Sequence, residues 1–162
     1  MRYNDQYLRW LYRRGRPNKF ARLQNRASAG AFAAGIWPRR LAALDVRGRT
    51  SGHIITLPVV ITEHAGERYL VSMLGEVNWV RNIRAAQGSA VLRHGRREEV
   101  RLVEVPAESR APVLRRYLEV APGGRPHIPV DRRAPLEEFQ KVAAQFPVFR
   151  ITAPTTGRPG SS

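Results

Sequence analysis

The chain lacks cysteine, contains only two lysines, Lys19 and Lys141, and has no long apolar run. Without cysteine it can form no disulfide, thiolate metal site or thiol nucleophile. Without about 18 consecutive apolar residues, the sequence predicts no transmembrane helix. Its first residues, MRYNDQYLRWLYRRGRPNKF, are polar where a signal peptide needs an apolar block. We therefore expect a cytoplasmic protein. The four histidines are scattered without metal-ligand spacing, so we expect no metal.

The charge is strongly positive and unevenly distributed. The net charge of +15 comes almost entirely from arginine. Residues 1–49 hold 12 basic groups against Asp5 and Asp45, a net of +10, whereas residues 50–162 hold 16 basic groups against 11 acids, a net of +5. Such a surface attracts nucleic acid, an anionic membrane or a small anionic molecule. A codon usage that favours arginine would explain why arginine outnumbers lysine. It would not explain why the positive charge is concentrated in residues 1–49.

Residues 1–38 read as one or two helices that precede the main domain. Tyr3, Tyr7, Trp10 and Leu11 fall on one helical face, and apolar residues recur near helical spacing after the GRPN break. One interpretation is a helix that covers the core of the domain. The alternative is an interfacial helix that makes peripheral contact with anionic lipid at the inner face of the cell membrane.

Residues 39–152 are rich in short strands. Strands are predicted at 41–46, 53–62, 68–73, 89–94, 98–105 and 147–152, separated by the turn signals GRTSG, HAGE and HGRR. Helices are predicted at 77–86, at 107–121 with an acidic first turn, and at 134–146. About six close strands with peripheral helices indicate an α+β barrel or sandwich. Residues 153–162 have the composition of a disordered tail.

The stretch GRTSG, residues 48–52, joins two of the predicted strands. As a plain hairpin loop, it would use Gly48 and Gly52 for positive φ, with Thr50 and Ser51 capping backbone groups. That interpretation leaves the arginines at 47 and 49 unexplained. Glycines, exposed N–H groups, two hydroxyls and a guanidinium together favour an anion-binding loop. The spacing is neither that of a P-loop nor that of a dinucleotide fingerprint.

A second group of polar residues lies at the start of the predicted helix 77–86. Asn78, Trp79 and Asn82 occupy its first turns, where free N–H groups can bind an anion. Trp79 shares a face with Ile83, which is equally consistent with a core position. The two asparagines are not needed for a core and could bind the polar edge of a planar heterocycle.

The pair of motifs GRTSG-x5-P and GE-x-NW-x-RN-x-RAA resembles the deazaflavin (F420)-dependent nitroreductase family, within the split β-barrel flavin and deazaflavin oxidoreductases. The resemblance covers roughly residues 41–105. It implies a small antiparallel split β-barrel that binds F420, a cofactor with a tricyclic ring, a phosphate and a glutamate tail, with FMN as the second choice. It also implies either a monomer or a homodimer.

The resemblance assigns cofactor contacts to four segments. Arg49, Thr50, Ser51 and Gly52 would hold the phosphate and the start of the tail. The ring would lie against Ile55, Leu57, Pro58, Val59 and Val60, with a wall formed by Val71, Ser72, Met73 and Leu74. Asn78, Trp79 and Asn82 would close the site. The chain differs from the family at Met73 and Leu74, where relatives carry a lysine and a glycine.

The expected reaction is hydride transfer from the reduced deazaflavin to a small electrophile, such as a quinone, an enone or a nitroaromatic. Ser72, His127, His53 or water would then supply a proton. Two alternatives stay open. One is a deazaflavin- or flavin-binding protein without turnover. The other is a basic nucleic-acid-binding protein, which is less favoured because the aromatic residues cluster in one helix rather than forming a stacking surface on strands.

Overall fold

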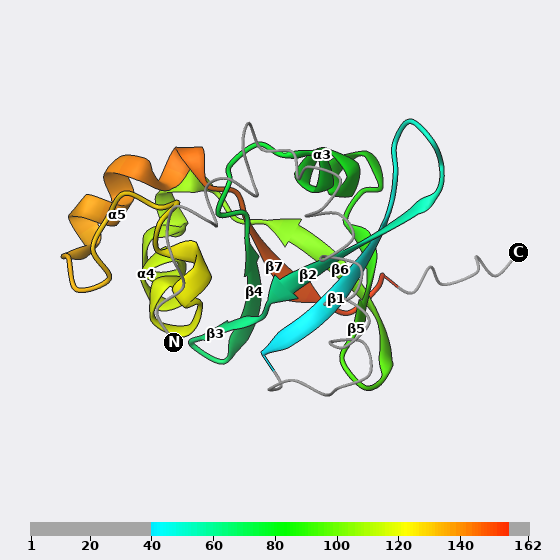
Figure 1. The fold of residues 1–162 in the computed structure, drawn as a ribbon, viewed down its shortest axis with the longest axis horizontal. Helices are drawn as coiled ribbons and strands as arrows, with labels where there is room; N and C mark the ends of the chain where they lie inside the picture. The colour runs from blue at the N-terminus through cyan, green and yellow to red at the C-terminus, as the bar shows by residue number, and fades with distance from the viewer. Residues whose placement is uncertain (1–39, 156–162) are drawn as a thin grey trace, which may run out of the picture.

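A computed structural model describes residues 40–155, which form a seven-stranded antiparallel sheet with three α-helices (Figure 1). The strands are β1 (Leu41–Arg47), β2 (Ile54–Val60), β3 (Thr62–His64), β4 (Glu67–Val71), β5 (Ser89–Arg93), β6 (Arg97–Glu104) and β7 (Val148–Thr152). The α-helices are α3 (Asn78–Ala85), α4 (Ala111–Val120) and α5 (Leu136–Val142). Short 3₁₀ turns, η2 (Ala107–Ser109), η3 (Pro122–Gly124) and η4 (Ala143–Gln145), flank α4 and follow α5. Within these residues no helix is long and apolar enough to cross a membrane.

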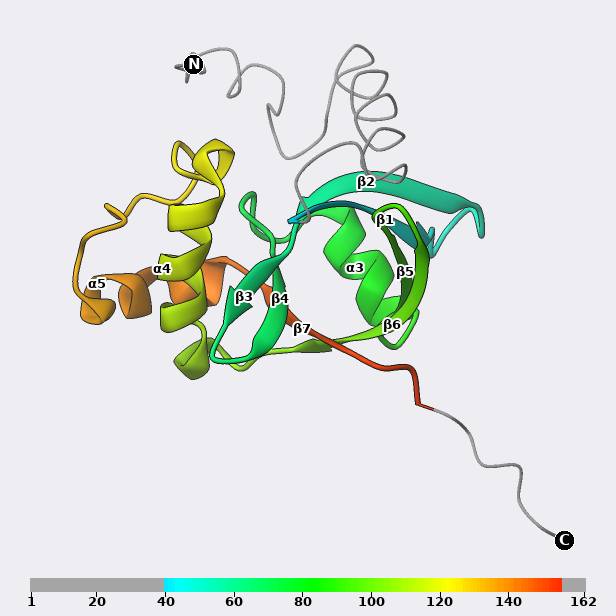
Figure 2. The ribbon, with the colours of Figure 1, turned by 90° about the horizontal axis from the view of Figure 1, so that it is seen from below.

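The sheet is curled, and its two edge strands are consecutive in the chain. The strand order is β2-β1-β5-β6-β7-β4-β3, so β2 and β3 occupy opposite edges although only Ile61 separates them. The expected single strand 53–62 was therefore wrong: it is two strands, joined at the buried Ile61. Figure 2 shows the strands arranged in a ring. The α+β split-barrel fold expected from the sequence is confirmed, with seven strands instead of about six.

The main core lies inside this ring, and α3 closes one end of it. Alternating residues of the strands point inward: Val100 and Leu102 of β6 are buried, whereas Arg101 and Val103 between and beside them are exposed. From α3, Val80 and Ile83 join the same apolar cluster. The apolar face of the helix therefore packs against the interior of the barrel. Figures 1 and 2 both show α3 next to the ring of strands.

A second core lies outside the ring, between α4, α5 and the strands β4 and β7. Leu114, Leu118 and Phe139 are completely buried there, next to Val148 at the start of β7. The predicted helix 107–121 is divided, because a 3₁₀ turn precedes α4, and α4 has no acidic residue in its first turn. By contrast, α5 begins after Pro135 and has Glu137 and Glu138 in its first turn, as expected.

Two parts of the predicted organisation fall outside the described residues. The helical segment 1–38, with its proposed contact to anionic lipid, lies entirely outside them. Of the predicted tail 153–162, only residues 153–155 are described, and Thr155 accepts a hydrogen bond from Arg101. The division into a helical segment, a barrel domain and a tail stays a prediction.

Candidate functional site

The two polar motifs predicted from the sequence meet in the structure. The backbone N–H of Arg49, in the β1–β2 turn, lies 3.2 Å from Oδ1 of Asn82 on α3, and Nη1 of Arg49 lies 2.8 Å from the same oxygen. Both groups donate a hydrogen bond to it. Asn82 is only 3% exposed, whereas Arg49 is exposed. The turn and the helix are thus linked directly across 33 positions of sequence.

The turn is partly braced by its own residues. Arg47 donates from Nη1 to the carbonyl of Gly52 at 2.9 Å, which gives this arginine a structural role that the sequence did not reveal. Gly52 has the expected positive φ of 72°, but Gly48 does not. Space is limited at Gly48 instead, because a Cβ there would lie 2.8 Å from Oγ of Ser51, 3.2 Å from Cδ1 of Ile55 and 3.3 Å from the carbonyl oxygen of His53.

Fewer backbone donors of the turn are available than the sequence suggested. Of the six N–H groups of residues 48–53, four bond within the described protein: Gly48 to His53, Arg49 to Asn82, Gly52 to Gly48, and His53 to Oγ of Ser51. The N–H groups of Thr50 and Ser51 have no partner within residues 40–155. Together with two hydroxyls and the exposed guanidinium of Arg49, they form a smaller but coherent set of anion donors.

The three residues predicted to close the site at the start of α3 differ in exposure and in their contacts. Asn78 is exposed at the first position of the helix, and Asn82 is buried against Arg49. Trp79 is half-buried, packs against the main core and has its ring 5.6 Å from that of Phe149. The tryptophan therefore contributes to the core, and only its remaining exposed surface is available to a ligand.

The predicted ring-binding residues of β2 do not share one face. Leu57 and Val59 pack against the main core, and their partners on β1, Leu44 and Ala42, belong to that core. Because strand residues alternate, Ile55 is on the inner face with them, while Pro58 points to the other face. Val60 packs against the second core. Proline is tolerated here because β2 is an edge strand.

The end of β4 and the segment after it contribute little exposed surface. Val71 and Met73 pack against the second core, and Leu74 is half-buried. Ser72 is 2% exposed, and its hydroxyl donates to the carbonyl of Gly75 at 2.6 Å. Its proton is therefore engaged in the turn that leads to α3.

His127, the other predicted proton donor, lies in the connection between η3 and α5. Figures 1 and 2 show that connection beside α4 and α5, at the opposite end of the molecule from the β1–β2 turn. His127 is therefore not brought together with the residues of the turn and α3. His53, which follows the turn directly, is exposed.

An ion-pair network that the sequence did not suggest supports α3 from outside. The guanidinium of Arg84 bonds to Glu104 at the end of β6 and to Glu76 just before the helix, with oxygen–nitrogen distances between 2.6 and 2.9 Å. The hydrogen bonds from Arg84 hold the pKa of the Glu76 carboxyl below its usual range. Glu76 and Glu104 are 8 and 20 positions from Arg84, so no local sequence pattern predicts these ion pairs.

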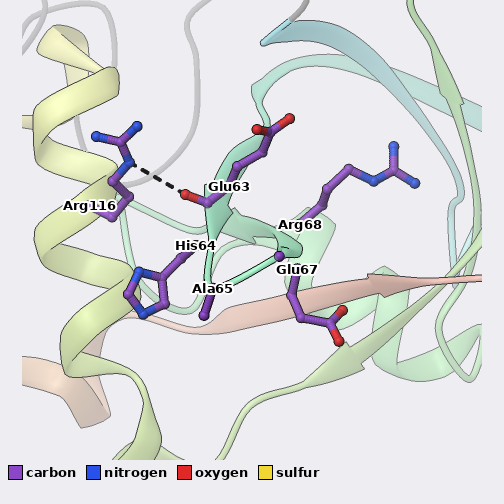
Figure 3. A pocket seen from close by; sticks show the side chains of 7 residues that line it. Glu63, His64, Ala65, Glu67, Arg68 and Arg116 are labelled. Atoms are coloured by element: carbon purple, nitrogen blue, oxygen red, sulfur yellow. Dashed lines mark hydrogen bonds between the residues drawn. The ribbon is translucent and has the colours of Figure 1, made fainter.

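A separate recess lies at the β3–β4 hairpin, away from this turn. It has a volume of about 540 Å³, and Figure 3 shows Glu63, His64, Glu67, Arg68 and Arg116 around it. Arg116 donates to the carbonyl of Glu63 across it. Carboxylates and guanidiniums largely compensate each other there, so the recess has no clear preference for an anion. Residues 40–155 contain no group of three or more potential metal ligands.

Several solved structures are similar to this chain. Among solved structures, a protein of unknown function from Agrobacterium tumefaciens has a TM-score of 0.53 at 14% identity, covering 81% of this chain and 54% of that one. A structure described as an F420-H2-dependent reductase has a TM-score of 0.48 at 20% identity, covering 70% and 94%. One described as a domain-swapped dimer has a TM-score of 0.49 at 16% identity, covering 82% and 93%. At these identities the similarity concerns the fold alone.

A search of curated protein sequences finds no match to this chain. The family model described as F420H(2)-dependent quinone reductase, however, matches residues 19–136, well over half of the sequence. That range includes both the β1–β2 turn and α3. The chain therefore belongs to the F420H2-dependent quinone reductase family and is an F420-dependent oxidoreductase.

Proposed function

We propose that the chain reduces a quinone with F420H2 and holds the cofactor between the β1–β2 turn and α3. The observation that carries this proposal is the double hydrogen bond from Arg49 to Asn82. It brings the cationic turn against the helix that bears the second motif. Each motif alone is a weak signal, but their contact in space supports one shared ligand site.

The residues present at this position fit an F420-type cofactor. The phosphate needs cationic and neutral donors, which Arg49, Thr50 and Ser51 offer on an exposed turn. The ring needs an apolar surface, and Ile55, one of three large apolar side chains exposed in the described chain, follows the turn at 43% exposure on the same face of β2 as Leu57 and Val59. Exposed apolar side chains beside convergent polar donors are typical of a small-molecule site.

When bound, the reduced deazaflavin supplies a hydride to the quinone, which takes up a proton to become a hydroquinone. The chain would bind the phosphate through Arg49, Thr50 and Ser51. It would orient the ring on the inner face of β2, where Ile55 lies in line with Leu57 and Val59. Because the Ser72 hydroxyl is buried and bonded to Gly75, we propose solvent water as the proton source.

The test is a fluorescence titration of the purified protein with F420, FMN and NADP in parallel. We expect F420 to bind in the micromolar range or tighter and ahead of the other two. Arg49→Ala should weaken F420 binding by about 1.5–3 kcal/mol, the worth of a hydrogen bond to a charged group. Arg81→Ala, which removes an exposed charge from the same region, should cost much less.

Turnover is measured with F420H2 and menadione, by following the return of the oxidised cofactor's visible absorbance. Menadione-dependent oxidation supports the quinone as substrate. Tight binding of F420 without oxidation by menadione would contradict it. Preferential binding of FMN would contradict the choice of cofactor at this site.

A further inference from the structure

We propose that Asn82 is a positioning residue whose carboxamide oxygen holds Arg49 ready for an anion and does not itself contact the cofactor. This inference rests on the proposed function, and it changes the role that the sequence motif suggested for Asn82. The sequence predicted a contact between this carboxamide and the ligand. The structure instead places its oxygen against Arg49.

The carboxamide oxygen of Asn82 has no capacity left for a ligand. A carbonyl oxygen has two lone pairs, and here one accepts the Arg49 backbone N–H at 3.2 Å and the other accepts the Arg49 guanidinium at 2.8 Å. At 3% exposure the side chain is also covered by protein. A bound cofactor could reach this oxygen only by displacing both donors.

The two hydrogen bonds fix both ends of one residue to a single atom. The backbone bond sets the path of the turn, and the guanidinium bond sets the direction of the side chain. An unrestrained arginine loses considerable rotamer entropy when it binds an anion. Since Asn82 already restrains Arg49 in the free protein, much of that loss precedes cofactor binding, and the affinity benefits accordingly.

The neutrality of Asn82 is as important as its position. Arg68, Arg84 and Arg93 are each held by a carboxylate, which compensates their charge. Arg49 is held by an uncharged amide, so its full positive charge remains available to a phosphate. Aspartate at position 82 would keep an acceptor but would also neutralise the arginine.

The first arm of the test needs no cofactor. The Arg49 Nε–H signal is observed by ¹⁵N NMR, with relaxation and solvent exchange measured, in the wild type and in Asn82→Ala, Asn82→Asp and Ile83→Val. Because Nη1 of the same guanidinium is bonded to Asn82, we expect an ordered Nε–H in the wild type and in Asn82→Asp, and a mobile one in Asn82→Ala. Ile83→Val trims the core side chain beside Asn82 and should leave Arg49 ordered. An Arg49 signal unchanged by Asn82→Ala would overturn the proposal.

The second arm measures F420 affinity in a double-mutant cycle. Asn82→Ala should weaken binding roughly two- to tenfold, as expected for loss of preorganisation of one long side chain. In the Arg49→Ala background the same substitution should have a clearly smaller effect, because only the bond from the backbone N–H of residue 49 then remains to be lost. Equal losses in both backgrounds would show that Asn82 acts independently of Arg49, and would overturn the proposal.

Asn82→Asp provides the remaining comparison. It should weaken F420 binding even though Arg49 stays ordered, and wild-type affinity would contradict the role of the neutral acceptor. This variant also decides the matter if Asn82→Ala does not fold. Failure of the wild type to bind F420 would overturn the proposed function and the cofactor part of this inference, while the NMR arm would still decide whether Asn82 orders Arg49.

Discussion

Glu98 of β6 and Arg68 of β4 form a partly exposed two-point ion pair on the inner face of the curled sheet, although β7 separates their strands. Each lies two residues before a core residue of its own strand, Val100 and Leu70 respectively, and therefore faces the same side of the sheet. His94 adds a further contact, with Nε2 3.1 Å from the Glu98 carboxylate. The hydrogen bond from Arg68 is the main reason that the pKa of Glu98 falls to about 2.

We predict that this pair makes the protein sensitive to acid. Because the folded-state pKa of Glu98 is depressed, its contribution to stability is present above the unfolded pKa of about 4.3 and is lost as the pH falls towards 2. Glu98→Gln should lower the free energy of unfolding by on the order of 1–3 kcal/mol at pH 7, a range reduced for partial exposure.

Urea unfolding between pH 7 and pH 2 provides the measurement. The variant should show a smaller loss of stability with acid than the wild type. Identical slopes in the two proteins would indicate that another group is responsible. Glu99→Gln, which changes an exposed carboxylate on the same strand, is the matched control.

Arg110 is predicted to be the most important charged residue for stability. Its side chain, 9% exposed, donates to the carbonyls of Val105, Ala143 and Phe146 and pairs with Glu104. Arg110→Ala would leave buried acceptors without donors and should cost about 3–5 kcal/mol. Lys141→Ala breaks an exposed pair with Glu138 and should cost less than about 1 kcal/mol. Thermal and urea unfolding of both variants compare them directly.

Gly88 is predicted to tolerate no side chain. It follows α3 with a φ of 84°, and a Cβ there would lie 2.3 Å from the carbonyl oxygen of Leu102. That contact involves backbone on both sides, so Gly88→Ala should destabilise the protein by more than about 2 kcal/mol. At Gly123 a Cβ would meet nothing within 4 Å, and Gly123→Ala should be nearly neutral. Equal melting temperatures for the two variants would contradict this account.

The neighbouring residues Ile54 and Ile55 should differ in their effect on cofactor binding. Both are exposed, but alternation places Ile55 on the inner face of β2 with Leu57 and Ile54 on the outer face. Ile55→Ser should therefore weaken F420 binding by about 1 kcal/mol through lost apolar contact, and Ile54→Ser should not. The F420 titration described above measures both variants. A larger loss of affinity in Ile54→Ser would indicate that the ring binds the outer face of β2 and would contradict this prediction.

The features that sequence analysis predicted well are those with a local period. The alternation of β6, with Val100 and Leu102 buried and Arg101 exposed, follows directly from the sequence. The proline and acids that begin α5 do so as well. The division of 53–62 at Ile61 could not be predicted, because both halves are equally good strand sequences and only the closure of the sheet separates them.

The candidate site was predictable in its parts but not in its internal contacts. The motifs located the turn and the helix, and the structure brings Arg49 and Asn82 together. Asn82 binds an arginine 33 positions away in the same chain. No sequence pattern predicts a contact over that separation. Likewise, Arg47 and Arg110 look like surface charge in the sequence, and only their carbonyl partners reveal a structural role.

The single residue between β2 and β3 has a mechanical consequence. Because a trans-peptide chain advances at most about 3.6 Å per residue, Ile61 ties the two free edges of the sheet within about 7 Å of each other. At this point the two edges are therefore joined by covalent bonds, and they cannot separate there to admit a ligand.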